Sequence, residues 1–292
     1  YIVNWFAKSL YHNYYHRLCG WSLSYWINRP NIDTFRQEIF NYVKHDQRDI
    51  TIRGLEHMML EFFRTFGFID CMKLAMCKLV SGPTNSDDER NPEMWKLQRA
   101  FFTRYGKMWG MKCQGVFIPN GLLANIYLTS VAQNDKGVIN IYGLEAELQR
   151  LLIPHRLTNG ALPVLYADDI YDPSTVVSKS NGVKNIFNLR MNSARIDIEH
   201  QFGLTASLFR RLSVKHTWKI MQMGGHVTEH LFSIFFMVNC YTCVRGNKTS
   251  AKYHIPAPSI EDYLDVTMDY ANDGDDADEL IIERLETRIE IN

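Results

Sequence analysis

The chain has 292 residues, of which 46% are hydrophobic and 13% aromatic, and its formal net charge is zero. This length suffices for one large domain or two modest ones, and the composition excludes an intrinsically disordered chain. We find no apolar run long enough to span a membrane, so no membrane partner is expected.

The charges are divided unevenly along the chain. Residues 259–292 hold 12 acidic and 2 basic residues, which leaves 30 basic and 20 acidic residues before them. An excess of basic residues in the body favours a polyanionic partner, most often nucleic acid. We interpret the acidic end as a solubilising tail, with a decoy that folds back on the basic face as the alternative.

The six cysteines form no dense framework, and no signal peptide opens the chain. We therefore expect reduced thiols and an intracellular protein. Cys240 and Cys243 form a C-x-x-C pair, but no second pair stands at the spacing of a zinc site, so no structural zinc is expected.

The first part of the chain is predicted to be helical, and the next part is predicted to form strands. Residues 1–64 contain segments such as NIDTFRQEIFNYVKH, 31–45, in which apolar residues recur at three- and four-residue spacing. Turn formers and charges predict a loop over 81–93. Residues 112–119 and 122–131 are predicted strands, and the Asn-Gly pair between them predicts a hairpin.

The second half of the chain combines a buried strand with helices. Residues 141–152 are predicted to form a short amphipathic helix, and 193–212 and 226–243 form longer ones. The apolar run 161–172 ends in acids, which is typical of a buried strand whose end carries carboxylates. A short helix is also expected near 279–290. These elements predict an α/β fold.

Three carboxylates are predicted to be presented from separate elements. Asp168 ends the buried strand, Glu199 lies on the helix that follows, and Asp135 follows the hairpin. Hard oxygen ligands that converge suit Mg²⁺ or Mn²⁺, and two such ions can hold the attacking and leaving oxygens of a phosphodiester. The alternative is that Asp168, Asp169 and Asp172 are solvated turn residues.

One face of the 192–203 helix is half charged and half aromatic. It is formed by residues at steps of three, four and three, namely Asn192, Arg195, Glu199 and Phe202. Two interpretations fit this face. The pair of Arg195 and Glu199 is a buried ion pair, or Glu199 is a metal ligand that the arginine steadies.

Seven segments carry motif-like patterns in a fixed order. They are GFIDCMKLAMCK (67–78), KCQGVFIPNGLLANIYL (112–128), QND (133–135), GLEAEL (143–148), YADDIY (166–171), MNSARIDIEHQFG (191–203) and NCYTCVRGNKTSAKYHIPAPSIEDYL (239–264). In this order they resemble the PIF/Harbinger-type transposases and the nucleases derived from them. The resemblance covers roughly residues 60–265, and the order of seven matches makes it specific.

The resemblance implies an RNase H-like mixed sheet flanked by helices over 65–258. A helical N-terminal region, 1–64, precedes it, and an acidic tail, 259–292, follows it. The resemblance also implies a D-D-E metal site for Mg²⁺ or Mn²⁺ that cleaves and transfers DNA strands, and therefore a nuclear protein. Carried over by position, Asp168 is the second acid and Glu199 is the third.

The first acid is the point at which the sequence departs from the family. The family pattern expects it at the end of the first hairpin strand, where this sequence has Asn120. Asparagine keeps an oxygen ligand without the charge, so it would bind divalent metal more weakly. Asp70 and Asp135 are the alternative candidates. Further departures, such as RYGKMW at 104–109 in place of G-H-K-R-x-H, leave both an active nuclease and an inactive descendant open.

An inactive descendant would act as a module that binds DNA or protein. Basic residues that are candidates for a phosphate-tracking face are Lys107, Lys112, Arg195, Arg210, Arg211 and Lys215. The alternative for each is a scattered surface charge. The chain has no homeodomain or zinc-finger signature, so besides double-stranded DNA the resemblance allows a separate DNA-binding partner protein.

A remote alternative is a zinc protease. The segment HVTEH, 226–230, fits the H-x-x-E-H motif, in which His226 and His230 would share Zn²⁺ and Glu229 would be the general base. A third protein ligand is needed, and the sequence singles out none.

Overall fold

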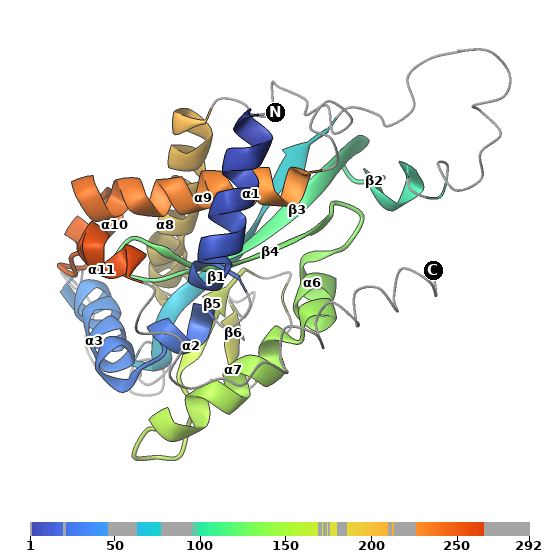
Figure 1. The fold of residues 1–292 in the computed structure, drawn as a ribbon. Coiled ribbons are helices and arrows are strands. Elements are labelled where there is room, and N and C mark those ends of the chain that lie inside the picture. The colour runs from blue at the N-terminus through green and yellow to red at the C-terminus, as the bar shows by residue number, and fades with distance from the viewer. Residues whose placement is uncertain are drawn as a thin grey trace, which may run out of the picture.

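The structure is a computed structural model, and Figure 1 shows its arrangement of helices and strands. It describes residues 2–19, 22–45, 63–76, 96, 98–168, 171, 174, 176–179, 186–209, 212 and 226–265. The predicted loop 81–93 and the predicted helix near 279–290 lie outside the described residues.

A mixed β-sheet forms the centre of the fold. Its strands are β1 (Thr65–Ala75), β2 (Phe102–Thr103), β3 (Met108–Phe117), β4 (Leu123–Ser130), β5 (Val164–Ala167) and β6 (Val177–Lys179). The order across the sheet is β4-β3-β1-β5-β6, and β2 pairs with the first residues of β3. β1, β3 and β4 are antiparallel neighbours, whereas β5 and β6 run parallel to β1. The expectation of an α/β fold is therefore confirmed.

Helices from the parts of the chain before and after the strands lie against the sheet. The described helices of at least eight residues are α1 (Ile2–Tyr14), α3 (Arg29–His45), α6 (Asp135–Tyr142), α7 (Leu144–Leu152), α8 (Ile186–Leu208) and α9 (Val227–Arg245). Shorter ones are η1 (Tyr15–Arg17), α2 (Ser22–Trp26), η3 (Ile153–His155), α10 (Lys248–Lys252) and α11 (Ile260–Leu264). α3 and α8 pack on β1, and α9 packs on α1, α8, α11 and β4. Figure 1 shows α6 and α7 on the opposite side of the sheet from α1 and α9.

Most of the predicted elements are confirmed. The hairpin is β3 and β4, and the buried strand that ends in acids is β5. The predicted helix 141–152 is two helices, because Gly143 takes a left-handed φ of 64° and ends α6. The helix predicted from residue 193 begins earlier, at Ile186.

The central strand β1 is the element that the sequence interpretation did not assign. Its first five residues are all buried, so apolar side chains point to both faces of the sheet. Gly67 lets β1 approach β3, since a Cβ atom at this position would lie 2.7 Å from the carbonyl oxygen of Phe117. β1 thus joins the antiparallel and parallel halves of the sheet.

No apolar run of membrane-spanning length was found in the sequence, but α9 is the one described helix that is long and apolar enough to cross a membrane. Its 19 residues reach a mean hydropathy of 1.2, and 56% of that window is buried inside the molecule. This is weak evidence for a membrane span, because the core helix of a soluble protein passes the same test. The packing of α9 on three helices and on β4 accounts for its apolar composition.

The cysteines that the structure describes are free thiols, namely Cys19, Cys71, Cys113, Cys240 and Cys243. Burial raises the pKa of the Cys240 thiol to about 11 and that of the Cys243 thiol to about 12. Both groups of the C-x-x-C pair therefore favour the protonated thiol over the thiolate that a zinc ion requires.

Candidate active site

Two parallel strands place two aspartates at matching positions, one within β1 and one directly after β5. Phe68 of β1 pairs with Tyr166 of β5. Asp70 and Asp168 lie two residues further along their segments. Side chains alternate between the faces of a strand, so we expect both carboxylates on the face of Phe68 and Tyr166. The charge of Asp168 raises the pKa of Asp70, which accords with their proximity.

A third carboxylate, Glu199 of α8, is joined to Asp70 through Arg195. Nη1 of Arg195 lies 2.7 Å from Oδ2 of Asp70, and Nη2 of the same residue lies 3.1 Å from Oε1 of Glu199. The side chains of Asp70 and Arg195 are 16% and 17% exposed, whereas that of Glu199 is 52% exposed. One guanidinium thus bridges a nearly buried acid and an open one. We call Asp70, Asp168 and Glu199 the carboxylate cluster.

The protonation of Asp70 reflects these neighbours. Its pKa is raised to about 6, and burial is the largest cause. The charges of Asp168 and Glu199 raise the pKa further, whereas Arg195 and the backbone N–H of Cys71 lower it. That N–H donates to Oδ1 of Asp70 over 2.8 Å. A cation bound to the carboxylate cluster would favour the ionised form of Asp70.

A glycine on β3 allows α8 to approach the sheet at this point. Gly115 pairs with Asp70, and a Cβ atom at Gly115 would lie 3.1 Å from the ring of Phe202. Phe202 is buried, and Arg195 and Glu199 lie two turns and one turn before it on the same helix. Asn192, the fourth residue of the predicted helix face, is exposed and lies outside these contacts.

Asp135 does not join the carboxylate cluster. Its Oδ1 lies 2.5 Å from Nζ of Lys112, whose side chain is 3% exposed. The same face of the sheet carries Gln114, which donates to the Tyr171 hydroxyl over 3.0 Å and to Sγ of Cys71 over 3.6 Å. Cys71 follows Asp70 on β1, so the two side chains point to opposite faces. The structure therefore places Asp135 on the face of the sheet opposite to Asp70.

Asn120 does not join the cluster either. It is buried in the turn between β3 and β4, where its Oδ1 accepts from the N–H of Leu122 over 3.2 Å. β3 residue Gly115, the partner of Asp70, lies five positions earlier, which is about 16 Å along a strand. Asn120, where the family pattern expects the first acid, thus lies apart from Asp70, which the sequence interpretation held as an alternative.

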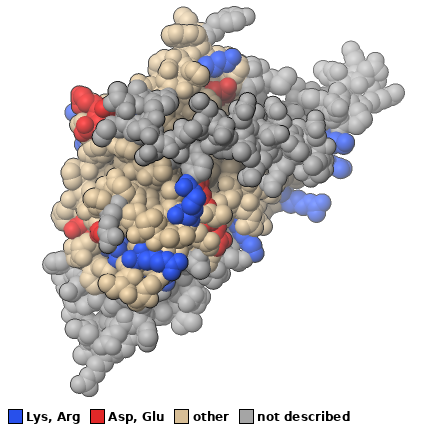
Figure 2. Space-filling view, turned by 60° about the horizontal axis from the view of Figure 1, so that its bottom comes forward, with Lys and Arg blue, Asp and Glu red and all other residues tan. Residues whose placement is uncertain are grey.

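The predicted DNA-binding residues are not gathered on one described surface. Lys112 is buried with Asp135, and Arg195 is bonded to Asp70 and Glu199. Neither side chain is therefore available to bind phosphate as it stands. The others predicted, Arg210, Arg211 and Lys215, lie outside the described residues. On the face that Figure 2 shows, Lys and Arg side chains are dispersed among other residues.

Lys107 is exposed in the turn between β2 and β3, with a left-handed φ of 49°. The neighbouring Tyr105 ring is 82% exposed, and Nζ of Lys73 lies 5.0 Å from its centre. The sequence interpretation named Lys107 alone. The contact between Lys73 and Tyr105 joins residues that are far apart in the sequence.

The H-x-x-E-H segment is bound into the fold. Nδ1 of His226 lies 3.1 Å from Oε1 of Glu229, and Nε2 of His230 lies 2.8 Å from Oδ1 of Asn4 on α1. Both rings therefore have protein partners in place of a shared zinc. In the part of the chain that the structure describes, no group of three or more His, Cys, Asp or Glu side chains is arranged to hold a metal ion as it stands.

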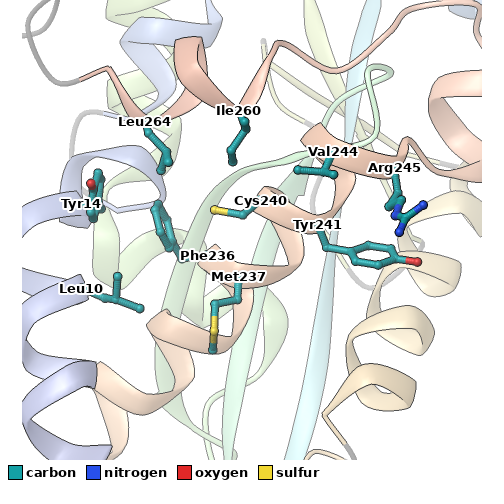
Figure 3. Close-up of a pocket in the computed structure, with 10 residues that line it drawn as sticks. All are labelled: Leu10, Tyr14, Phe236, Met237, Cys240, Tyr241, Val244, Arg245, Ile260 and Leu264. Atoms are coloured by element: carbon teal, nitrogen blue, oxygen red, sulfur yellow. The ribbon is translucent and has the colours of Figure 1, made fainter.

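An apolar hollow of about 650 Å³ lies between α1, α9 and α11 (Figure 3). The side chains that line it are mostly apolar, and Arg245 is the charged residue among them. Its lining offers no carboxylate, so this hollow and the carboxylate cluster are chemically unlike.

Comparison of the chain with protein-family models, with curated proteins and with solved structures finds no match.

Proposed function

We propose that the chain is a metal-dependent nuclease with an RNase H-like fold, of the D-D-E type found in PIF/Harbinger transposases, which cleaves DNA phosphodiester bonds. Asp70, Asp168 and Glu199 would be its three acids. The observation that carries the proposal is the cluster itself, in which Arg195 joins Asp70 to Glu199 and the charge of Asp168 acts on Asp70.

The strand order supports the proposed fold. An antiparallel meander of three strands, followed by two strands parallel to the first, is the order of an RNase H-like sheet. Asp70 lies on β1, Asp168 directly follows β5, and Glu199 lies on α8, the helix that follows β6. With Asp70 in the first position, the proposal no longer needs a charged residue in place of Asn120.

The donor set fits a hard divalent cation. Mg²⁺ and Mn²⁺ prefer carboxylate oxygens, and Asp70, Asp168 and Glu199 would hold such an ion. Arg195 already satisfies two of these acids, so the cluster attracts positive charge. When bound, the metal would supply Lewis-acid chemistry at a phosphoryl oxygen.

The chain's own residues would divide the remaining tasks by their exposure. Asp70 is on the central strand, where burial and the Cys71 N–H fix its carboxylate. Glu199 is half-exposed and can meet a substrate from solvent. The two acids thus combine a rigid ligand with an accessible one.

A test of this function is Mn²⁺-dependent cleavage of duplex DNA by four purified proteins. We expect Asp70→Asn, Asp168→Asn and Glu199→Gln each to lower the cleavage rate by about 100-fold or more relative to wild type. Thermal melts would verify that each variant is folded. Cleavage that survives all three substitutions at the wild-type rate would reject the proposal.

The bridging guanidinium also favours a second function, an inactive descendant that binds DNA. In that protein Arg195 would permanently neutralise Asp70 and Glu199 in place of a metal. Salt-dependent binding of duplex DNA without cleavage, unchanged by Glu199→Gln, would identify this alternative.

A further inference from the structure

The guanidinium of Arg195 occupies the space between two acids of the carboxylate cluster. Its Nη1 contacts Asp70 at 2.7 Å, and its Nη2 contacts Glu199 at 3.1 Å. Two terminal nitrogens of one side chain therefore bind oxygens from a strand and from a helix. A divalent ion that used both carboxylates would compete with this guanidinium for the same oxygens.

The two carboxylates are the partners that hold the guanidinium of Arg195 in its place. Nε of Arg195 is buried and has no hydrogen-bond partner among the described residues. The arginine is thus bound through its outer nitrogens alone. Loss of these two contacts would release the whole group.

The exposed surface of α8 beside Arg195 leaves room for an alternative position of its side chain. Asn192 and Ile196, on the neighbouring positions of the helix, are exposed, and so is Glu199. Arginine has several rotatable bonds, and a change of rotamer would carry its charged end from the cluster into water.

We propose that Arg195 is an internal cation, which holds Asp70 and Glu199 together when metal is absent and leaves them when Mg²⁺ or Mn²⁺ binds. This inference rests on the proposed function, because it assigns a metal to the carboxylate cluster. In this role Arg195 is a positioning residue that lowers the affinity of the carboxylate cluster for metal. A metal ion that uses both carboxylates must displace the guanidinium.

The direction in which one substitution changes the affinity for Mn²⁺ tests the exchange. Calorimetry would measure Mn²⁺ binding to wild type, Arg195→Gln and, as the matched control that keeps the charge, Arg195→Lys. If the guanidinium competes with the metal, Arg195→Gln should bind Mn²⁺ about tenfold more tightly than wild type. Arg195→Lys should stay within about threefold of wild type. Mn²⁺ should also raise the melting temperature of Arg195→Gln by more than that of wild type.

A change of Mn²⁺ affinity in the opposite direction would overturn the proposal. If Arg195 instead orients Glu199 for the metal, Arg195→Gln should bind Mn²⁺ more weakly than wild type or equally well. That result would reject the exchange and leave the proposed function standing. No Mn²⁺ binding to any of the folded proteins would reject both.

A measurement on wild type covers the case in which Arg195→Gln does not fold. The Nε–H signal of Arg195 in an NMR spectrum would be assigned by its absence from Arg195→Lys. Titration with diamagnetic Mg²⁺ should shift this signal saturably as the guanidinium leaves the carboxylates. A signal that stays unchanged while Mg²⁺ raises the melting temperature would contradict the exchange.

Discussion

The two faces of the β1 and β3 pair each carry an acid bound to a base, yet they differ in charge balance and exposure. On one face Lys112 and Asp135 form an ion pair whose opposite charges balance, with side chains 3% and 15% exposed. On the other face a single arginine serves Asp70 and Glu199, and Glu199 is 52% exposed. The closed, balanced pair is suited to stability. The open face with surplus negative charge is suited to binding a cation.

The largest expected effect comes from breaking the closed pair. Lys112→Met would leave Asp135 without the lysine in a largely buried place. We expect the free energy of unfolding to fall by about 3–5 kcal/mol, as for other buried pairs that lose one partner. Urea denaturation would measure this loss.

The double variant Lys112→Met/Asp135→Leu is the matched control for this loss. It removes both charges, so it should recover a large part of the stability. A loss below about 1 kcal/mol in the single variant would show that the pair is not a structural element.

A partly buried acid on α7, Glu147, gives a pH-dependent effect of nearly the same size. Burial raises the pKa of Glu147 to about 7, although the Tyr127 hydroxyl and Arg150 lower it. A raised pKa of an acid means that stability is full below about pH 4.5 and is lost as pH rises through about 7. Because the ionised form is the costly one, Glu147→Gln should add up to roughly 3 kcal/mol at pH 8.

Denaturation of wild type and Glu147→Gln at pH 4 and pH 8 would check this. The two proteins should differ more at pH 8 than at pH 4. The same difference at both pH values would contradict the assignment of the shift to Glu147.

A smaller effect is expected from a variant that tests the contact between α8 and the sheet. A Cβ atom in Gly115→Ala would lie 2.9 Å from Leu123 and 3.1 Å from Phe202. We expect a loss of about 1–3 kcal/mol from overpacking, together with weaker Mn²⁺ binding, since α8 carries Glu199. Thermal melts and calorimetry would measure the two effects.

Gly203 is the control glycine on the same helix, because a Cβ atom there meets nothing within 4 Å. Gly203→Ala should add about 0.5–1 kcal/mol through helix propensity. A loss of stability in both variants would show that the effect of Gly115→Ala is not specific to its contact with Phe202.

Local patterns in the sequence mark the proposed second and third acids. An apolar run that ends in acids marks Asp168, and a spacing of four residues joins Arg195 to Glu199. Both features are visible within one element. The α/β class and the hairpin were predicted for the same reason.

Asp70, the proposed first acid, was ambiguous in the sequence because its strand has no alternating pattern. β1 is buried on both faces at its start, and such an apolar run is not distinguished from a buried helix by periodicity. The contact from Arg195 to Asp70 spans 125 residues, so no local motif reveals it. Only the pairing of β1 with β5 sets Asp70 beside Asp168 rather than Asp135 or Asn120.

The most direct test of the metal site is calorimetry of Mn²⁺ with wild type, Asp70→Asn and Asp135→Asn. We expect Mn²⁺ to bind wild type and Asp135→Asn alike, and binding to be lost in Asp70→Asn. Each substitution replaces one carboxylate oxygen. The comparison therefore tests the two faces of the β1 and β3 pair separately. Mn²⁺ binding that survives in Asp70→Asn and disappears in Asp135→Asn would contradict the assignment of the first acid.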